Sequence, residues 1–200
     1  MIRRLIVLAT LAFAAPALAQ QPPQPAPQAK PAAPKPAQAQ APKGLDPQNT
    51  IYLDTTQGRV VIKLRPDLAP KHAERIKQLA REKFYDNAPF HRVIAGFMAQ
   101  TGDGANGDGT GGSKYPNLPA EFSNVPYTRG IVGMARAQNP NSANSQFFIM
   151  LNEYPSLNGQ YTVVGEVVSG MDTVDKIKKG EPVANPDRIV KMQVAADAKQ

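Results

Sequence analysis

The first part of the chain with a regular pattern contains two runs rich in β-branched residues, at 51–55 and 59–64. Three residues, Thr56-Gln57-Gly58, separate the two runs. A short polar connection with a glycine between two such runs is typical of a hairpin. The pattern therefore predicts two antiparallel strands joined by a tight turn.

A helical period follows the hairpin. Apolar residues recur at helical spacing from Ala73 to Phe84, with charged residues between them. Pro70 suits the first turn of a helix, where its missing N–H has no intrahelical partner to lose. The pattern predicts an amphipathic helix that begins at Pro70 and ends near Lys83. His72 lies near its start, and we expect its side chain at the surface.

From residue 90 onward, short β-rich runs alternate with turns and irregular segments. A glycine-rich stretch covers 102–112, irregular sequence continues to about 127, and a second helix is expected at 171–179. Many short strands, two helices and no βαβ rhythm predict an antiparallel barrel or sandwich with helical caps. The further strands are expected at 90–101 (a pair), 131–135, 147–151, 161–168 and 189–195.

Residues 1–19 have the three parts of a secretory signal peptide. Arg3 and Arg4 form a positive start, an apolar run covers 5–15, and small residues close the segment at 17–19. A membrane anchor is the alternative, but the run is too short to span a bilayer core of roughly 30 Å. We therefore expect cleavage after residue 19, export to the periplasm and no stable membrane insertion of the mature chain.

Residues 20–44 consist almost wholly of Pro, Ala, Gln and Lys. Such a segment cannot bury enough apolar surface to offset its ordering entropy, so a disordered tether is predicted there. A role as a proline-rich ligand is the alternative interpretation of this composition. The folded domain is expected at 45–200, which is long enough for one well-packed core. The chain has no cysteine, which excludes disulfides, cysteine metal sites and cysteine nucleophiles.

The formal net charge of +7 suggests a nucleic-acid partner at first sight. Five of the 23 basic residues lie in residues 1–44, however, so 18 basic residues face 16 acidic ones in the domain, a net charge of +2. The domain also lacks a dense basic run with interleaved aromatic residues. Nucleic-acid binding is therefore not expected.

Some motifs of the domain have competing interpretations. Three glycines satisfy the G-x-G-x-x-G pattern of dinucleotide sites: Gly102, Gly104 and Gly107. Further glycines at 109–112 prevent the helix that such a site needs. Asp103 and Asp108 among these glycines could suggest Ca²⁺ binding. The ligand pattern of a Ca²⁺ loop is absent, which favours turn chemistry. The two histidines, His72 and His91, lack the spacing of a zinc site, and we expect no metal or cofactor.

Two segments, 90–103 and 133–151, combine apolar residues with hydrogen-bonding ones. Arg92 lies amid apolar residues on a predicted strand, where an arginine is costly unless its guanidinium is paired or faces a cleft. On the residues alone, a partly buried ion pair and a ligand site explain Arg92 equally well.

These two segments closely resemble the signature stretches of the cyclophilin family of peptidyl-prolyl cis-trans isomerases. The motif F-H-R-x-I-x-G-F-M-x-Q begins at Phe90, G-T-G-G at Gly109 and S-Q-F-F-I at Ser145. The TTxGxVxIxL of the hairpin is also similar, and the resemblance covers about 49–194. It implies a mainly β fold, a closed eight-stranded antiparallel barrel capped by two helices, with a packed interior and an active face on the outside.

The resemblance also implies the roles of individual residues. Arg92 would be the catalytic residue. The proline pocket would be lined by Phe97, Met98, Phe148 and Leu157, and the groove completed by His91, Gln100, Ala135, Arg136, Gln146 and Tyr161.

Three positions depart from the family pattern. Ser156 stands where many members have an aromatic residue, Tyr161 where many have a histidine, and Arg136 where eukaryotic members commonly have an asparagine. Bacterial members often share the changes at Tyr161 and Arg136, so these two bear on ligand preference more than on activity.

The function implied is cis-trans isomerisation of X-Pro bonds in exported proteins, assisting their folding. Proline-containing polypeptides would be the partners, no cofactor would be needed, and the protein would act as a monomer. The alternative is a non-catalytic chaperone module that binds proline peptides in the same groove. The presence of Arg92 and of the pocket phenylalanines favours the enzyme.

Overall fold

The computed structural model describes residues 42–198, so the predicted signal peptide and most of the predicted tether lie outside the described residues. Within this part neither α-helix combines the length and the apolar character needed to cross a membrane. The strands are β1 Thr50–Thr55, β2 Gly58–Leu64, β3 Arg92–Ile94, β4 Met98–Thr101, β5 Ile131–Met134, β6 Phe147–Met150, β7 Val163–Ser169 and β8 Ile189–Val194. The helices are α1 Pro70–Arg81 and α2 Met171–Lys176, with short 3₁₀ turns at Pro47–Asn49, Pro140–Ser142, Pro155–Leu157 and Ala195–Asp197.

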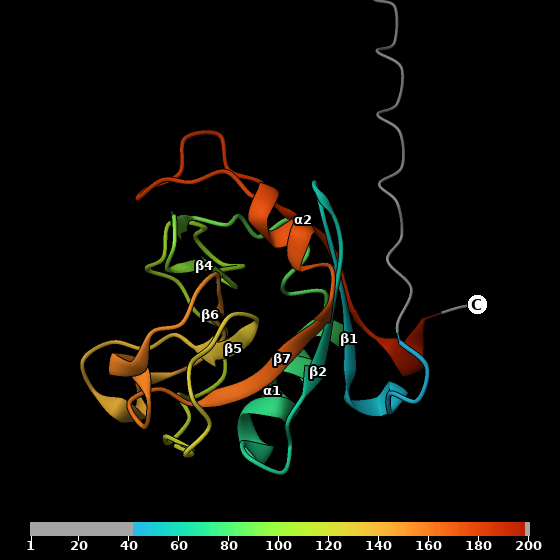
Figure 1. Ribbon diagram of the computed structural model, residues 1–200, viewed down its shortest axis with the longest axis vertical. Helices are drawn as coiled ribbons and strands as arrows, with labels where there is room; N and C mark the ends of the chain where they lie inside the picture. Colours follow the sequence, from blue (N-terminus) through green and yellow to red (C-terminus); the bar gives the residue numbers. More distant parts are fainter. Residues whose placement is uncertain (1–41, 199–200) are drawn as a thin grey trace, which may run out of the picture. The chain divides into compact units, whose positions relative to one another are not determined.

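All eight strands form one antiparallel sheet in the order β3-β4-β6-β5-β7-β2-β1-β8. The sheet curls into a half-barrel, and Figure 1 shows α1 and α2 at opposite ends of it. Strands β3 and β8 stand at the two ends of this order, and no ladder joins them within residues 42–198. The predicted mainly β architecture, with eight antiparallel strands and two helices, is confirmed, and the strands form one curled sheet.

The hairpin predicted from the first two runs is present as β1 and β2, which pair with Thr55 opposite Gly58. The Thr55 hydroxyl donates to the Gly58 carbonyl at 2.8 Å and accepts from the Gln57 N–H at 3.1 Å. A single threonine side chain thus ties both sides of the turn together, which explains how so short a connection holds the register.

Helix α1 begins at Pro70, as predicted, and buries the apolar face made by Ala73, Ile76, Leu79 and Ala80. The expectation that His72 lies at the surface is wrong. His72 is fully buried, and its Nδ1 lies 2.7 Å from the Glu121 carboxylate, which also accepts the N–H groups of Lys71 and His72. The carboxylate of a distant loop therefore caps this helix and covers a face that the local period assigned to solvent.

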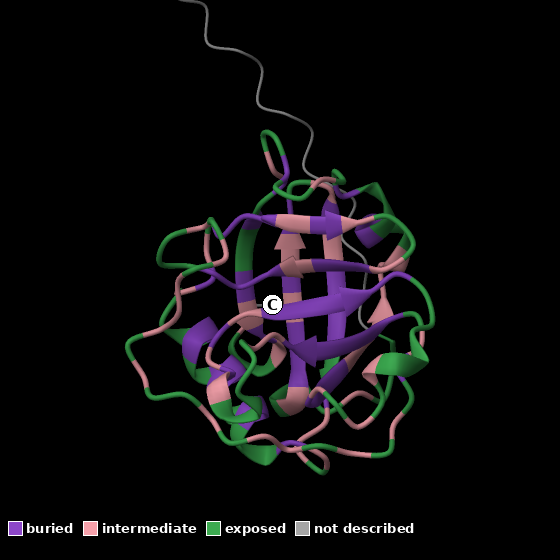
Figure 2. Ribbon diagram, turned by 90° about the vertical axis from the view of Figure 1, so that its left-hand side faces the viewer, coloured by how far each residue is buried: buried purple, intermediate pink, exposed green. Residues whose placement is uncertain are grey.

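Side chains alternate between the two faces of each strand and so form two separate clusters. On β6, Phe147 and Ile149 belong to the inner core, whereas Phe148 and Met150 belong to a smaller cluster on the outer face. Figure 2 shows buried positions running along the strands and exposed ones concentrated in the surrounding loops. The inner core is mainly aliphatic and contains Ile51, Leu53, Ile62, Leu79, Phe90, Phe147, Ile149 and Met192.

The glycine loop, residues 102–112, is organised around one buried carboxylate. Asp103 is 1 % exposed and accepts the backbone N–H groups of residues 105, 106, 109 and 111 at 2.9–3.2 Å. Burial alone would raise the pKa of Asp103, but these amide donors outweigh it and lower the pKa. A Cβ at Gly111 would lie 2.2 Å from Asp103 Oδ1, so the close approach requires glycine. The carboxylate is engaged by turn amides, as the turn interpretation of this motif requires.

Candidate active site

Strand alternation places three of the expected site residues in one row on the outer face. Arg92 on β3 is opposite Gln100 on β4, and Gln100 is in turn opposite Phe148 on β6. Side chains that are opposite each other on paired strands share a face of the sheet. The guanidinium, the amide and the ring are therefore positioned by backbone ladders rather than by loops.

A cavity of about 120 Å³ opens beside this row. It is called the apolar cavity here after the four apolar side chains in its lining, Phe97, Met98, Phe148 and Leu157. It is formed by segments that are far apart in the sequence. All its lining residues are among those that the family resemblance implies. They are Arg92, Phe97, Met98, Gln100, Ala135, Arg136, Phe148, Leu157 and Tyr161.

Phe148 is held in place by aromatic neighbours. Tyr127 stacks on it at a ring-centroid distance of 5.9 Å, and Tyr161 meets it edge-on at 5.7 Å. A Cβ at Gly133 would lie 2.5 Å from Phe148 Cζ, so the glycine makes room for the ring. The apolar cavity consequently has a rigid aromatic wall whose shape is set before any ligand arrives.

Tyr154 is an aromatic residue at this site that sequence reasoning missed. Its ring lies 4.4 Å from that of Phe97, centroid to centroid, and 42 % of the residue is exposed. Position 156, where many family members have an aromatic residue, carries Ser156 here. The ring of Tyr154 thus supplies aromatic surface next to Phe97 from two residues earlier in the loop. An aromatic residue in an otherwise polar loop was the available signal.

The structure supports both interpretations of Arg92 that the sequence left open, an ion pair and a ligand site. Its side chain is 38 % exposed and lines the apolar cavity, and its Nε donates to the carboxylate of Glu181. Within residues 42–198 no protein acceptor engages either terminal amino group, Nη1 or Nη2. The ion pair therefore leaves the forked end of the guanidinium available to a ligand. Glu181, 89 positions away in the chain, gave no signal in the sequence pattern.

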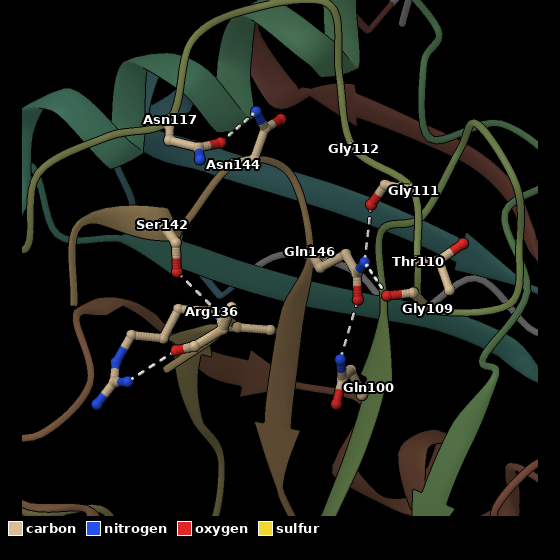
Figure 3. Close-up of a pocket in the computed structure, with 12 residues that line it drawn as sticks. Gln100, Gly109, Thr110, Gly111, Gly112, Asn117, Arg136, Ser142, Asn144 and Gln146 are labelled. Carbon is tan, nitrogen blue, oxygen red and sulfur yellow. Dashed lines mark hydrogen bonds between the residues drawn. The ribbon is translucent and has the colours of Figure 1, made fainter. Parts of the chain in front are cut away.

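A second, larger cavity of about 360 Å³ adjoins the first and shares Gln100, Ala135 and Arg136 with it. It is called the polar cavity here because most of its lining residues are polar. Figure 3 shows the polar cavity between the glycine loop and residues 135–146. The Gln146 amide donates to the carbonyls of Gly109 and Gly111 at 2.8 Å and accepts from Gln100 Nε2 at 3.0 Å. Gln146 lines the polar cavity but not the apolar one, and its amide connects the glycine loop to Gln100.

Arg136 and Tyr161, two of the departures from the family pattern, contact each other. The Arg136 guanidinium lies 4.5 Å above the centroid of the Tyr161 ring and donates to the carbonyls of residues 137, 138 and 160. In Figure 3 the guanidinium is directed away from Gln100 and Gln146. The arginine therefore lines the cavities with its stem, while its charge stabilises the tyrosine and the adjoining loops.

His91 lines neither cavity, although the resemblance placed it in the groove. It is 7 % exposed, and a Cβ at Gly109 would lie 3.0 Å from its ring, so it is packed beneath the glycine loop. Burial lowers the pKa of His91, and the nearby carboxylate of Asp103 opposes this only in part. Across residues 42–198, no group of three or more His, Asp or Glu side chains is arranged to hold a metal ion.

Comparison with known sequences assigns the described region to a family model. The model described as "Cyclophilin type peptidyl-prolyl cis-trans isomerase/CLD" matches residues 50–194. A probable peptidyl-prolyl cis-trans isomerase of Brucella suis is 59 % identical over 175 residues, covering 80 % of this chain and 89 % of its own. Peptidyl-prolyl cis-trans isomerase B of Escherichia coli is 42 % identical over 136 residues, covering 64 % of this chain and 83 % of its own.

Solved structures have the same architecture. A cyclophilin from Hirschia baltica superposes with a TM-score of 0.72 at 29 % identity, covering 78 % of this chain and 77 % of its own. A cyclophilin-type isomerase from Cryptosporidium parvum, crystallised in the presence of the dipeptide Ala-Pro, gives a TM-score of 0.67 at 29 % identity, covering 72 % of this chain and 98 % of its own.

Proposed function

Because this chain belongs to the cyclophilin-type peptidyl-prolyl cis-trans isomerase family, we propose that Arg92 and the apolar cavity form its catalytic centre. The protein is a peptidyl-prolyl cis-trans isomerase and accelerates rotation about X-Pro bonds. One observation carries the assignment of the site. A guanidinium with an unengaged fork stands at the wall of a preformed apolar cavity.

The reaction needs no covalent chemistry. Rotation about an X-Pro bond has a barrier of about 20 kcal/mol because amide resonance is lost in the twisted state. An enzyme lowers this barrier only by binding the twisted amide better than either planar isomer. An acceleration of about 10⁵ requires roughly 7 kcal/mol of such differential stabilisation.

Each part of the proposed site stabilises a different part of the twisted substrate. The proline ring would enter the apolar cavity against Phe148, while the acyl side of the bond remains free to turn. Once resonance is lost, the prolyl nitrogen carries a lone pair, and Nη1 or Nη2 of Arg92 can donate to it or to the adjacent carbonyl. The Gln100 side chain is oriented by the hydrogen bond that its Nε2 donates to Gln146 Oε1. It would anchor the flanking peptide.

A non-catalytic proline-peptide module is the rival function, since it could use the same cavity. The two functions differ in one measurement, which is two-dimensional exchange NMR on an Ala-Pro peptide with catalytic amounts of the protein. The isomerase accelerates cis-trans exchange far below stoichiometric concentration. The binding module would shift peptide resonances and leave the exchange rate unchanged, and that result would refute the catalytic proposal. The Ala-Pro dipeptide of the C. parvum structure supports the choice of this peptide.

We propose further that the protein acts on exported clients in the periplasm, assisting their folding. Support comes from the signal-like pattern of residues 1–19 and the tether composition of residues 20–44, most of which lie outside the described residues. Fractionation of cells followed by intact-mass analysis tests this proposal. We expect a mature chain beginning at Gln20 in the periplasmic fraction, and an intact Met1 terminus there would refute it.

Closure of the barrel and a monomeric state are also proposed. Closure is supported by backbone hydrogen bonds between residues 87–90 and 187–189, from Asn87 N to Ile189 O at 2.7 Å and from Phe90 N to Asp187 O at 2.9 Å. A monomer is supported by the small number of large apolar side chains that are exposed in the described region, which are Phe122, Tyr154 and Val190. Hydrogen exchange of the Asn87 and Phe90 amides tests closure, and light scattering tests the mass in solution.

A further inference from the structure

The segment between α2 and β8 contacts the free edge of strand β3. Gly180 and Val93 exchange backbone hydrogen bonds at 2.8 Å in both directions, and the Val183 N–H donates to the His91 carbonyl at 3.1 Å. Residues 180–183 are called the edge segment here. Since its two attachment points are on either side of Arg92, Glu181 is placed next to the arginine by the backbone.

Both ends of the edge segment are fixed in the fold. Gly180 has a φ of +157°, and a Cβ there would lie 2.8 Å from the Pro182 carbonyl oxygen, so the tight bend requires glycine. On either side of the segment, Asp187 accepts the Lys178 N–H at 2.9 Å and the Thr56 hydroxyl at 2.7 Å. Glu181 therefore extends from a backbone that is held in place by hydrogen bonds on both sides of it.

The Glu181 carboxylate contacts one side of the guanidinium only. It accepts from Nε of Arg92, and within residues 42–198 it is the carboxylate that forms an ion pair with this arginine. An arginine side chain has many rotamers, and fixing it for catalysis costs conformational entropy. A partner at Nε removes part of that freedom and leaves Nη1 and Nη2 available as donors to a ligand.

We propose that Glu181 is a positioning residue that holds the Arg92 fork in the orientation needed by the twisted amide. This inference rests on the proposed role of Arg92. It assigns Glu181 no contact with substrate, so its effect must act through the arginine. Loss of the anchor would then lower kcat, because the fork must be ordered during each turnover, and would leave KM nearly unchanged.

The test compares Glu181→Ala, which removes the acceptor, with Glu181→Gln, which keeps a neutral acceptor of the same shape. We expect Glu181→Ala to lower kcat about three- to tenfold, the range set by ordering one flexible side chain. Glu181→Gln should recover part of this loss, and KM should stay within about twofold of wild type. Glu74→Gln on α1 is the matched control, because it removes an exposed carboxylate elsewhere.

Two further measurements separate this proposal from its premise. In an Arg92→Ala background, Glu181→Ala should have no additional effect on the exchange rate, as a double-mutant cycle requires when one residue acts through the other. The Arg92 Nε–Hε resonance should shift upfield in Glu181→Ala and much less in Glu181→Gln. Melting temperatures should stay within about 2 °C, as expected for an exposed ion pair.

The outcomes distinguish failure of the proposal from failure of the Arg92 assignment. If Arg92→Ala isomerises normally, the proposed catalytic centre is wrong. If Arg92→Ala is inactive but Glu181→Ala retains wild-type kcat, the positioning role alone is overturned. An increase in kcat would also overturn it, since the carboxylate would then compete with substrate. An equal loss in the Arg92→Ala background would show that Glu181 acts by another route.

Discussion

Phe147 and Phe148 are neighbours in the chain and lie on opposite faces of the same strand. Phe147 packs in the inner core, edge-on to Tyr85 at 5.7 Å between ring centroids. Phe148 packs on the outer face between Tyr127 and Tyr161 and lines the apolar cavity. The pleat of one strand thus separates a residue that stabilises the fold from a residue that shapes the site.

The two faces differ in what their neighbours require. On the inner face, apolar volume is sufficient, and even the buried Tyr85 hydroxyl has its partner, the Ser145 carbonyl at 2.9 Å. On the outer face, Arg92 and Gln100 line the apolar cavity, so their orientation matters for the proposed chemistry. Substitutions on the inner face should therefore act on unfolding, and those on the outer face mainly on turnover.

The largest effect is expected from truncating the inner phenylalanine. Phe147→Ala should lower the free energy of unfolding by about 3–5 kcal/mol, because it leaves a cavity in a closed core. Activity per folded molecule should remain close to wild type. Phe148→Ala should instead lose most of its activity at all substrate concentrations, with a smaller loss of stability. Urea unfolding and exchange NMR on both variants check the contrast, which fails if Phe148→Ala isomerises normally.

Arg92→Ala should have the next largest effect, on catalysis alone. We expect kcat to fall by about 10² or more, in line with the loss of one preorganised donor to the transition state. Ground-state affinity for the peptide should fall much less, because the planar amide offers the donor little. Arg92→Lys should rescue poorly, since an ammonium cannot reproduce the fork.

The control for this prediction is the melting temperature of the Arg92→Ala variant. Because the Arg92 side chain is 38 % exposed, the variant should unfold close to the wild-type temperature. If the residue served only a structural ion pair, the variant would melt early and isomerise normally. That combination would show that Arg92 stabilises the fold and does not act in turnover.

A pH effect of moderate size is expected from His72, which is buried on α1. Burial lowers the pKa of His72, although its hydrogen bond to Glu121 opposes the shift, and the nearby cations Lys71 and Arg75 add to it. The unfolded state therefore binds the proton more readily, with a pKa of about 6.5. The stability that neutral His72 contributes is complete above this value and is lost as the pH falls through the lower folded-state pKa.

His72→Gln, whose amide can still donate to Glu121, should show a shallower loss of stability on acidification than wild type. Chemical denaturation at a series of pH values between neutral and mildly acidic checks this. His91, whose pKa is also lowered by burial, is present in both proteins, so its contribution to the pH dependence of stability cancels in the difference. Parallel curves for the two proteins would remove His72 as the source.

The smallest effect is expected from deleting the tether, residues 20–44, because the described residues that line the two cavities all lie between 92 and 161. The catalytic rate on a short peptide should stay within about twofold of the full mature chain. A large loss of rate in the truncated protein would mean that the tether contributes to catalysis together with the outer face of the sheet.

Local patterns predicted much of this fold and of its site. The hairpin, helix α1 and the strands around Arg92 follow from period and turn chemistry, which report on neighbours within a few residues. The family resemblance then supplied all the residues that line the apolar cavity. Five of them, Arg92, Phe97, Met98, Gln100 and Phe148, belong to the motifs that begin at Phe90 and Ser145. These two motifs meet because β3 pairs with β4 and β4 pairs with β6.

What the sequence did not reveal depends on contacts between distant segments. His72 was assigned to the surface because a helical period does not show that the loop at Glu121 covers the helix. Glu181 and Tyr154 stand in loops without period, and only the folded chain brings them to Arg92 and Phe97. The hydrogen bonds of Gln146 likewise depend on where the glycine loop passes.

The edge segment also affects how this protein meets unfolded chains. An unpaired strand edge is a template on which an extended polypeptide can add a strand, and isomerase clients are extended polypeptides. At β3, the hydrogen bonds to Gly180 and Val183 already occupy the carbonyl of His91 and both the N–H and the carbonyl of Val93. A client therefore cannot add a strand at this edge beside Arg92, and it would be held there through the contacts proposed above for Arg92, Gln100 and the apolar cavity. We expect short residence times as a consequence, which allow release after one rotation and protect the enzyme from co-aggregating with its clients.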